Sequence, residues 1–159
     1  MKLSRSDALL GAGAVLASGA FAGALVSQHL FDLQPCPWCV LIRLITVLLA
    51  LTCAVGLAWR SSMGRRASAG LGLALSGAGI AAALWLHFVA AASASCNLTL
   101  ADRIMSATGL DARWPQVFAA YASCADAKAS LLGVPYELLS VALFLLIGSG
   151  LVAVLRRPD

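Results

Sequence analysis

The sequence predicts an all-α fold, a polytopic membrane four-helix bundle formed as a single domain over residues 1–159. Three observations predict it: four long apolar stretches, few charges, and a mean hydropathy of +0.91. Of the residues, 61% are hydrophobic and 11% are charged, whereas a soluble domain is about half apolar and a quarter charged. Lipid is therefore the expected solvent for most of the chain.

The four apolar stretches cover approximately residues 8–30, 40–59, 67–92 and 134–155. About 20 such residues are needed to cross the hydrocarbon core. All four stretches should be helices, because a backbone exposed to lipid must satisfy its own hydrogen bonds. The first stretch follows a basic start, which also suits a cleaved signal peptide, but its apolar run exceeds the roughly 7–15 residues of a signal core.

The basic residues predict the orientation of the bundle, since they concentrate on the cytoplasmic side of membrane proteins. If the spans alternate, one side carries Lys2, Arg5, Arg60, Arg65, Arg66, Arg156 and Arg157. The N- and C-termini are then in the cytoplasm, and two segments face outward, at approximately residues 31–39 and 93–133. This topology explains the net charge of +4, so no nucleic-acid partner is predicted.

Two further patterns concern how the chain packs. In the longer outward segment, the stretch Leu98 to Met105 is amphipathic, and the run Trp114 to Phe118 is expected to lie flat on the membrane surface. Within the spans, small residues such as the pair Gly19 and Gly23 predict close approach between helices.

The five cysteines sort by topology. Cys36 and Cys39 lie in the first outward segment, and Cys96 and Cys124 lie in the second. Cys53 lies in the second span, and the helical rise places it about 21 Å deeper than Cys39. Because a disulfide needs Cα atoms within about 7 Å, Cys53 is expected to be a small buried hydrophobe.

The position of Cys36-Pro37-Trp38-Cys39 at a helix start predicts thiol–disulfide redox chemistry. Helix N-termini offer unpaired N–H donors and a partial positive charge, which stabilise a thiolate at Cys39. Arg43 follows one turn later on the same helix face, and a costly arginine just inside the membrane is a functional candidate. The alternatives are snorkelling of Arg43 to the headgroups and purely structural disulfides.

No metal site is predicted from the cysteines. A structural zinc ribbon usually has two Cys-x-x-Cys knuckles, but Cys96 and Cys124 are separated by 27 residues. The sequence also contains no haem or dinucleotide fingerprint.

The sequence resembles the DsbB family of quinone-dependent, disulfide-forming oxidoreductases of the bacterial inner membrane. The resemblance covers nearly the whole chain, and its most specific parts are Pro35 to Arg43 and the run Trp114 to Phe118 ahead of Cys124. The family motif is Cys-x-x-Cys with arginine at the fourth position after it, which Arg43 matches. The family often has a polar residue just before this arginine, where this chain has Ile42.

The resemblance implies an electron path that starts at a reduced periplasmic partner, a DsbA-like thioredoxin-fold oxidase. The partner attacks the Cys96–Cys124 disulfide and forms a mixed disulfide with Cys96. Cys124 then pairs with Cys36, and Cys39 is left as the thiolate that contacts a membrane quinone, either ubiquinone or menaquinone. These four cysteines are the implied catalytic residues, and they act on the periplasmic side of the inner membrane.

Cys39, Arg43 and His87 are the expected quinone-binding residues. Arg43 would hydrogen-bond a quinone carbonyl, and His87 lies near the depth of Arg43 in the third span. Helix packing is the alternative role of His87, and His29 near the outer end of the first span is a further candidate. Glu137, at the start of the fourth span, is interpreted as an interfacial residue.

Two other functions remain open. Vitamin K epoxide reductase-like enzymes also join a four-helix bundle to a Cys-x-x-Cys pair, but their pair lies late in the bundle, whereas this one opens the second span. A non-enzymatic membrane subunit with stapled loops would instead have permanent structural disulfides, which a DsbA-like protein cannot exchange.

Overall fold

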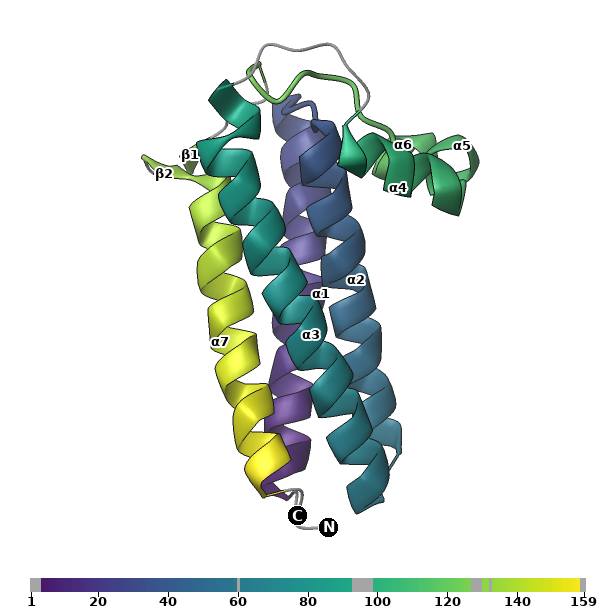
Figure 1. The fold of residues 1–159 in the computed structure, drawn as a ribbon, viewed down its shortest axis with the longest axis vertical. Coiled ribbons are helices and arrows are strands. Elements are labelled where there is room, and N and C mark those ends of the chain that lie inside the picture. The colour runs from purple at the N-terminus through teal and green to yellow at the C-terminus, as the bar shows by residue number, and fades with distance from the viewer. Residues whose placement is uncertain (1–3, 60, 93–98, 127–129, 132, 158–159) are drawn as a thin grey trace.

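The computed structural model describes residues 4–59, 61–92, 99–126, 130–131 and 133–157. Its four long helices are α1 (Arg5–Phe31), α2 (Pro37–Ala58), α3 (Ser62–Phe88) and α7 (Tyr136–Arg156). They pack as one bundle whose two chain ends lie together (Figure 1). The all-α bundle predicted from the sequence is confirmed, and each of the four segments is long and apolar enough to cross a membrane.

The shorter elements gather at the end of the bundle opposite the chain termini (Figure 1). They are η1 (Ala90–Ala92), α4 (Leu100–Thr108), α5 (Leu110–Arg113), α6 (Pro115–Phe118), β1 (Ser130–Leu131) and β2 (Val134–Pro135). The two strands form an antiparallel pair directly before α7. This end of the molecule therefore contains most of the chain that lies outside the four long helices.

The helices α4 to α6 dock on the side of α2 through a small apolar cluster. Val40 of α2, Met105 of α4 and Phe118 of α6 are all buried in it. Phe118 also stacks on Phe21 of α1, with ring centroids 6.5 Å apart. Trp114, by contrast, is exposed. The run that was expected to lie flat on a membrane surface thus turns its phenylalanine into the bundle and leaves its tryptophan outside.

Helices α1, α2 and α3 begin earlier than the hydropathy pattern indicates. Proline suits the first position of a helix, where its missing N–H is not needed, and α2 accordingly begins at Pro37, with Cys36 as its N-cap. The helix α3 begins at Ser62, so Arg65 lies in its first turn instead of in the link before it. Nη2 of Arg65 is 2.6 Å from Oδ1 of Asp7, which ties α3 to the start of α1.

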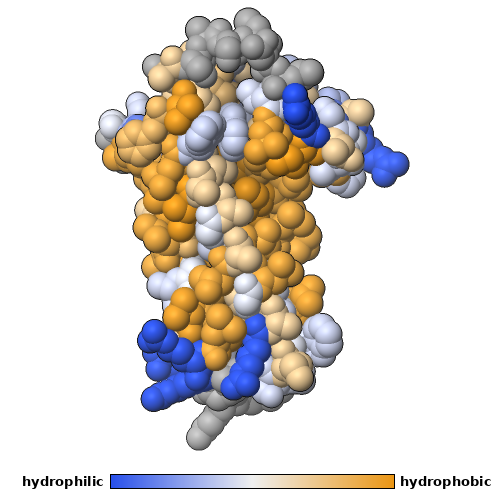
Figure 2. All heavy atoms as spheres, in the orientation of Figure 1, coloured by the Kyte–Doolittle hydropathy of each residue, from blue (hydrophilic) through white to orange (hydrophobic). Residues whose placement is uncertain are grey.

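The sides of the bundle are apolar. Figure 2 shows hydrophobic residues along the length of the visible face, with hydrophilic residues at the end where the termini lie and on the short helices. Large hydrophobic side chains, including Val15, Leu51, Leu71 and Leu145, are more than half exposed. An apolar band of this extent is unusual for a surface in water and suits a surface in lipid.

Glycines of α3 allow its close packing on α7. A Cβ placed on Gly79 would lie 2.5 Å from Cε2 of Phe144, which is fully buried. A Cβ on Gly72 would lie 2.8 Å from Cδ1 of Leu151. At Gly19 and Gly23 no described atom lies within 4 Å of such a Cβ, so these two glycines do not make the predicted helix contact within the described bundle.

Replacing Gly79 by alanine should destabilise the bundle by about 1–3 kcal/mol, because an added methyl group overpacks a filled contact. Gly77→Ala is the matched control, since no described atom lies within 4 Å of a Cβ at Gly77 and alanine favours a helix over glycine. Thermal unfolding of the purified variants in detergent measures the difference. Equal stability of the two variants would contradict the close contact between α3 and α7.

Candidate functional site

The redox pair lies at the first turn of α2. The backbone N–H of Cys39 donates to Sγ of Cys36 over 3.3 Å, so Cys36 caps the helix with its sulfur. The two Sγ atoms are 2.7 Å apart. Cys36 is fully buried, whereas Cys39 is half-buried. The two cysteines of the pair therefore differ in access to their surroundings.

The loop between α6 and β1 brings Cys124 to the same place. Its side chain hydrogen-bonds that of Cys36, and the backbone of Trp38 hydrogen-bonds the Cys124 sulfur. The loop is held there by the carbonyl of Pro35, which accepts from the N–H groups of Tyr121 and Ala122 over 3.0 and 3.3 Å. Sulfur atoms from two distant parts of the chain thus meet at one helix start.

The structure brings together three of the four cysteines that the family resemblance implies. Cys36 lies between Cys39 and Cys124, and Cys96 is outside the described residues. Cys53 is fully buried in the core of the bundle, near Gly13 of α1, as expected for a small hydrophobe. The sulfurs of Cys36 and Cys124 lie ahead of the N-terminus of α2, and the free N–H groups at the start of a helix point in that direction. The backbone groups of the first turn of α2 therefore contact these two sulfurs.

The contacts between Cys36 and Cys124 change their acidities in opposite directions. The hydrogen bond with Cys36 lowers the pKa of Cys124 to about 7, from an ordinary 9.0. Hydrogen bonds with Cys124 and Cys39, followed by burial, raise the pKa of Cys36. Of these two thiols, when both are reduced, Cys124 therefore ionises near neutral pH and Cys36 retains its proton.

Arg43 is buried within the protein one turn below Cys39. Its Nη1 donates to Oε1 of Gln28 and to the carbonyl of Val117, and its Nη2 donates to the carbonyl of Ala24 over 3.2 Å. This arrangement differs from snorkelling, because the guanidinium turns inward and joins α1, α2 and α6. Arg43 also interacts electrostatically with Cys39.

Gln28 is a site residue that the sequence analysis missed. Its Oε1 accepts from Arg43, and its Nε2 donates to the carbonyl of Gln116 over 3.2 Å, so it bonds both the arginine and the loop helix α6. The signal was available in the sequence, because a buried amide inside an apolar span requires a partner. The position of that partner, 15 residues further along the chain, required the fold.

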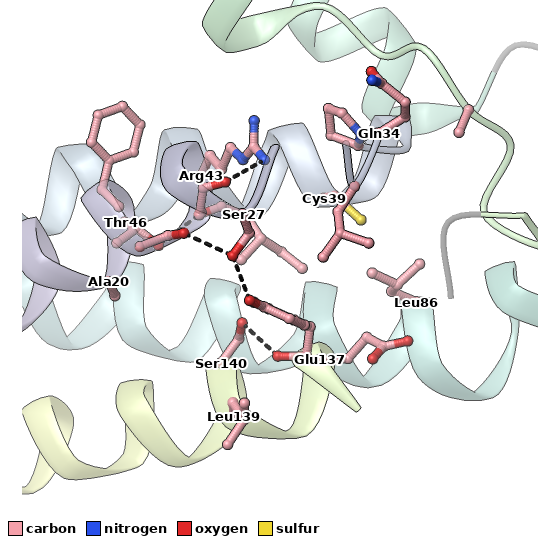
Figure 3. A pocket seen from close by; sticks show the side chains of 18 of the residues that line it. Ala20, Ser27, Gln34, Cys39, Arg43, Thr46, Leu86, Glu137, Leu139 and Ser140 are labelled. Atoms are coloured by element: carbon pink, nitrogen blue, oxygen red, sulfur yellow. Dashed lines mark hydrogen bonds between the residues drawn. The ribbon is translucent and has the colours of Figure 1, made fainter. Parts of the chain in front are cut away.

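Cys39 and Arg43 line one cavity of about 730 Å³. Its walls come mainly from α1, α2 and α7, and Leu86 closes it from α3. Figure 3 shows Cys39, Arg43 and Thr46 on one wall, facing Glu137, Leu139 and Ser140 on the other. The polar side chains that the helices contribute besides Cys39 and Arg43 are Ser27, Thr46, Tyr136, Glu137 and Ser140.

The two histidines do not line this cavity. The ring of His87 packs edge-on against Phe88, with centroids 4.9 Å apart, and it is the neighbouring Leu86 that faces the cavity. His29 is exposed. Contact between His87 and a quinone therefore stays a prediction, whereas Cys39 and Arg43 share a site.

Comparisons with known proteins agree on one family. The family model described as disulfide bond formation protein DsbB matches residues 6–154. A disulfide bond formation protein B from Chromohalobacter salexigens is 34% identical over 145 residues, which are 84% of each chain. One from Ralstonia nicotianae is 34% identical over 156 residues, 92% of this chain and 91% of the relative. No solved structure matches the chain significantly.

Reduced Cys124 should react as a thiolate near neutral pH, because its pKa is about 7. Its rate of alkylation by iodoacetamide is expected to level off by about pH 8, whereas an ordinary thiol continues to gain reactivity above that pH. Replacing Cys36 by alanine removes the hydrogen bond that lowers the pKa, so the midpoint should move to higher pH. Mass spectrometry after timed alkylation measures both, and an unmoved midpoint would exclude Cys36 as the cause.

Proposed function

The chain belongs to the DsbB family of disulfide bond formation proteins, and from this premise we propose that it is a thiol:quinone oxidoreductase. It reoxidises a periplasmic DsbA-like thioredoxin-fold oxidase and passes two electrons to a membrane quinone, either ubiquinone or menaquinone. It is a multi-pass protein of the bacterial inner membrane, with both termini in the cytoplasm. Its catalytic cysteines, Cys36, Cys39, Cys96 and Cys124, act on the periplasmic side.

One observation carries the proposal: Cys36 contacts both Cys39 and Cys124. Thiol–disulfide exchange moves a disulfide from one partner to another when a thiolate reaches the sulfur it attacks. A sulfur with a neighbour on each side can pair with either one. Cys36 can therefore transfer its disulfide bond between the loop and the start of α2.

The backbone of Trp38 supports the direction of exchange, because its hydrogen bond to Cys124 lowers the pKa of this thiol and does not depend on a proton on Cys36. A thiol with a low pKa is the better leaving group, so a partner that attacks the Cys96–Cys124 disulfide at Cys96 releases Cys124 as a thiolate. Cys124 then attacks Cys36 and forms the Cys36–Cys124 disulfide. This step breaks the Cys36–Cys39 bond and releases Cys39 as the thiolate that lines the cavity.

The cavity fits the headgroup of a quinone. Its walls are mainly apolar, as a flat ring requires, and a few polar groups converge on it. The Arg43 guanidinium is held in place by Gln28 and backbone carbonyls, and it can donate to a carbonyl oxygen and stabilise negative charge there. When bound, a quinone would supply the two-electron oxidant that converts a dithiol into a disulfide.

Replacing Cys39 by serine should abolish quinol formation, because serine cannot pair with Cys36 or pass on its electrons. The assay mixes purified protein, a short-chain ubiquinone and a reduced thioredoxin-fold partner, and it follows quinol absorbance and partner thiols. Cys53→Ala is the matched control, since Cys53 lies in the core outside the cavity. Undiminished quinol formation in Cys39→Ser would refute the assignment of Cys39.

Replacing Arg43 by methionine should lower kcat for quinol formation about 100-fold, the usual cost of losing a donor to a developing oxyanion. Exchange between the partner and the loop cysteines should persist, because it occurs outside the cavity. Arg103→Met is the control, since Arg103 is an exposed residue of α4 that does not line the cavity. Equal kcat in both variants would show that Arg43 has only a structural role.

A further inference from the structure

Glu137 lies on the wall of the cavity, in the first turn of α7. Its position at the start of a span favours an interfacial role from the sequence alone. In the structure, however, its Oε2 atom is buried and has no hydrogen-bond partner among the described residues. Such an atom is costly, and in a native protein it requires an explanation.

The other polar side chains that the helices contribute to the α1 and α7 walls already have partners. The hydroxyl groups of Tyr136 and Ser27 hydrogen-bond each other over 2.5 Å. The hydroxyl of Ser140 donates to the carbonyl of Tyr136 over 3.1 Å. Among these described side chains, Glu137 is therefore the one with an unsatisfied buried oxygen, and Figure 3 places its side chain across from Cys39 and Arg43.

Reduction of a quinone requires protons as well as electrons, at two oxygens on opposite ends of the ring. The guanidinium of Arg43 stabilises negative charge but does not release a proton in proteins. A second group must therefore protonate the oxygen that points away from Arg43. The titratable and charged residues that line the cavity are Asp32, Cys39, Arg43, Asp126, Tyr136 and Glu137.

Geometry separates Glu137 from the other two carboxyl groups. Asp32 is exposed and accepts from Nε2 of Gln34, and Asp126 is exposed and accepts from the hydroxyl of Ser123. Both carboxylates are satisfied where solvent reaches them. Glu137 alone among the three has a buried oxygen that faces no partner.

We propose that Glu137 is a catalytic residue that donates a proton to the quinone oxygen on the α7 side, while Arg43 binds the opposite oxygen. The inference rests on the proposed function and deepens it. Once the partner's second thiol has freed Cys96 and Cys96 has displaced Cys36 from Cys124, two electrons leave Cys36 and Cys39 as their disulfide forms. The quinol receives these electrons together with the two protons that the partner's dithiol has given up. Glu137 passes on one proton and recovers one, so it is unchanged after a turnover.

The test compares Glu137→Gln with the unchanged full-length protein, using a short-chain ubiquinone and a reduced thioredoxin-fold partner. Glutamine keeps the shape and can donate a hydrogen bond, but it cannot release a proton. The kcat for quinol formation should therefore fall about 100-fold, with KM for the quinone unchanged. Independently of activity, the infrared difference spectrum between oxidised and reduced bound quinone should show a carboxyl C=O band that is lost in the variant.

Two further variants serve as controls. Glu137→Asp keeps a carboxyl group and should recover part of the rate and show a shifted infrared band, which also tests the inference if Glu137→Gln does not fold. Asp111→Asn removes a carboxyl group that does not line the cavity, and its rate should match that of the unchanged protein.

The outcomes separate the two proposals. If the unchanged protein fails to oxidise its partner with quinone, the proposed function is wrong. If it succeeds and Glu137→Gln matches it in kcat and in the infrared band, only the role of Glu137 is overturned. If Asp126→Asn instead loses the rate and the infrared band while Glu137→Gln keeps both, the role of Glu137 is also overturned. The proton donor would then lie at the outer mouth of the cavity.

Discussion

The arrangement of the site depends on one buried charge, the guanidinium of Arg43. A charge inside an apolar bundle is costly unless hydrogen bonds surround it. Arg43 finds them on Gln28 and on the backbone carbonyls of Ala24 and Val117, and each partner fixes a different part of the chain. Satisfying the charge therefore also docks α6 against the bundle. The loop that follows α6 continues from there to Cys36.

The contacts that hold the loop also separate the polar side of the site, where the sulfurs meet, from its apolar side, which is the cavity. The loop is anchored at Pro35 by Tyr121, so the meeting point of the sulfurs lies on top of α2. The cavity lies below it, between helices, with Cys39 at the boundary. In the proposed function, protein thiols would approach from water and the quinone from the membrane. The two reactants would then not share one binding surface.

Local spacing explains what the sequence could predict. Cys36, Cys39 and Arg43 lie within about two helical turns, so once residues 37–58 are recognised as a helix their proximity follows. Lipid solvation likewise determines the four spans. The meeting of Cys36 with Cys124, and of Arg43 with Gln28, depends on loop docking and helix packing across many residues, which no local pattern encodes. The glycine pair Gly19 and Gly23 shows the same limit, since small residues on a helix allow a close contact but do not determine which helix makes it.

The contact between Gly79 and Phe144 has a consequence for sequence variation. Every missense change at the glycine codon adds at least one carbon where the aromatic ring already lies. The backbones of α3 and α7 can keep their separation only if position 144 loses volume at the same time. The two positions should therefore covary among homologous proteins, as a large residue on one helix matched by the smallest possible residue on the other.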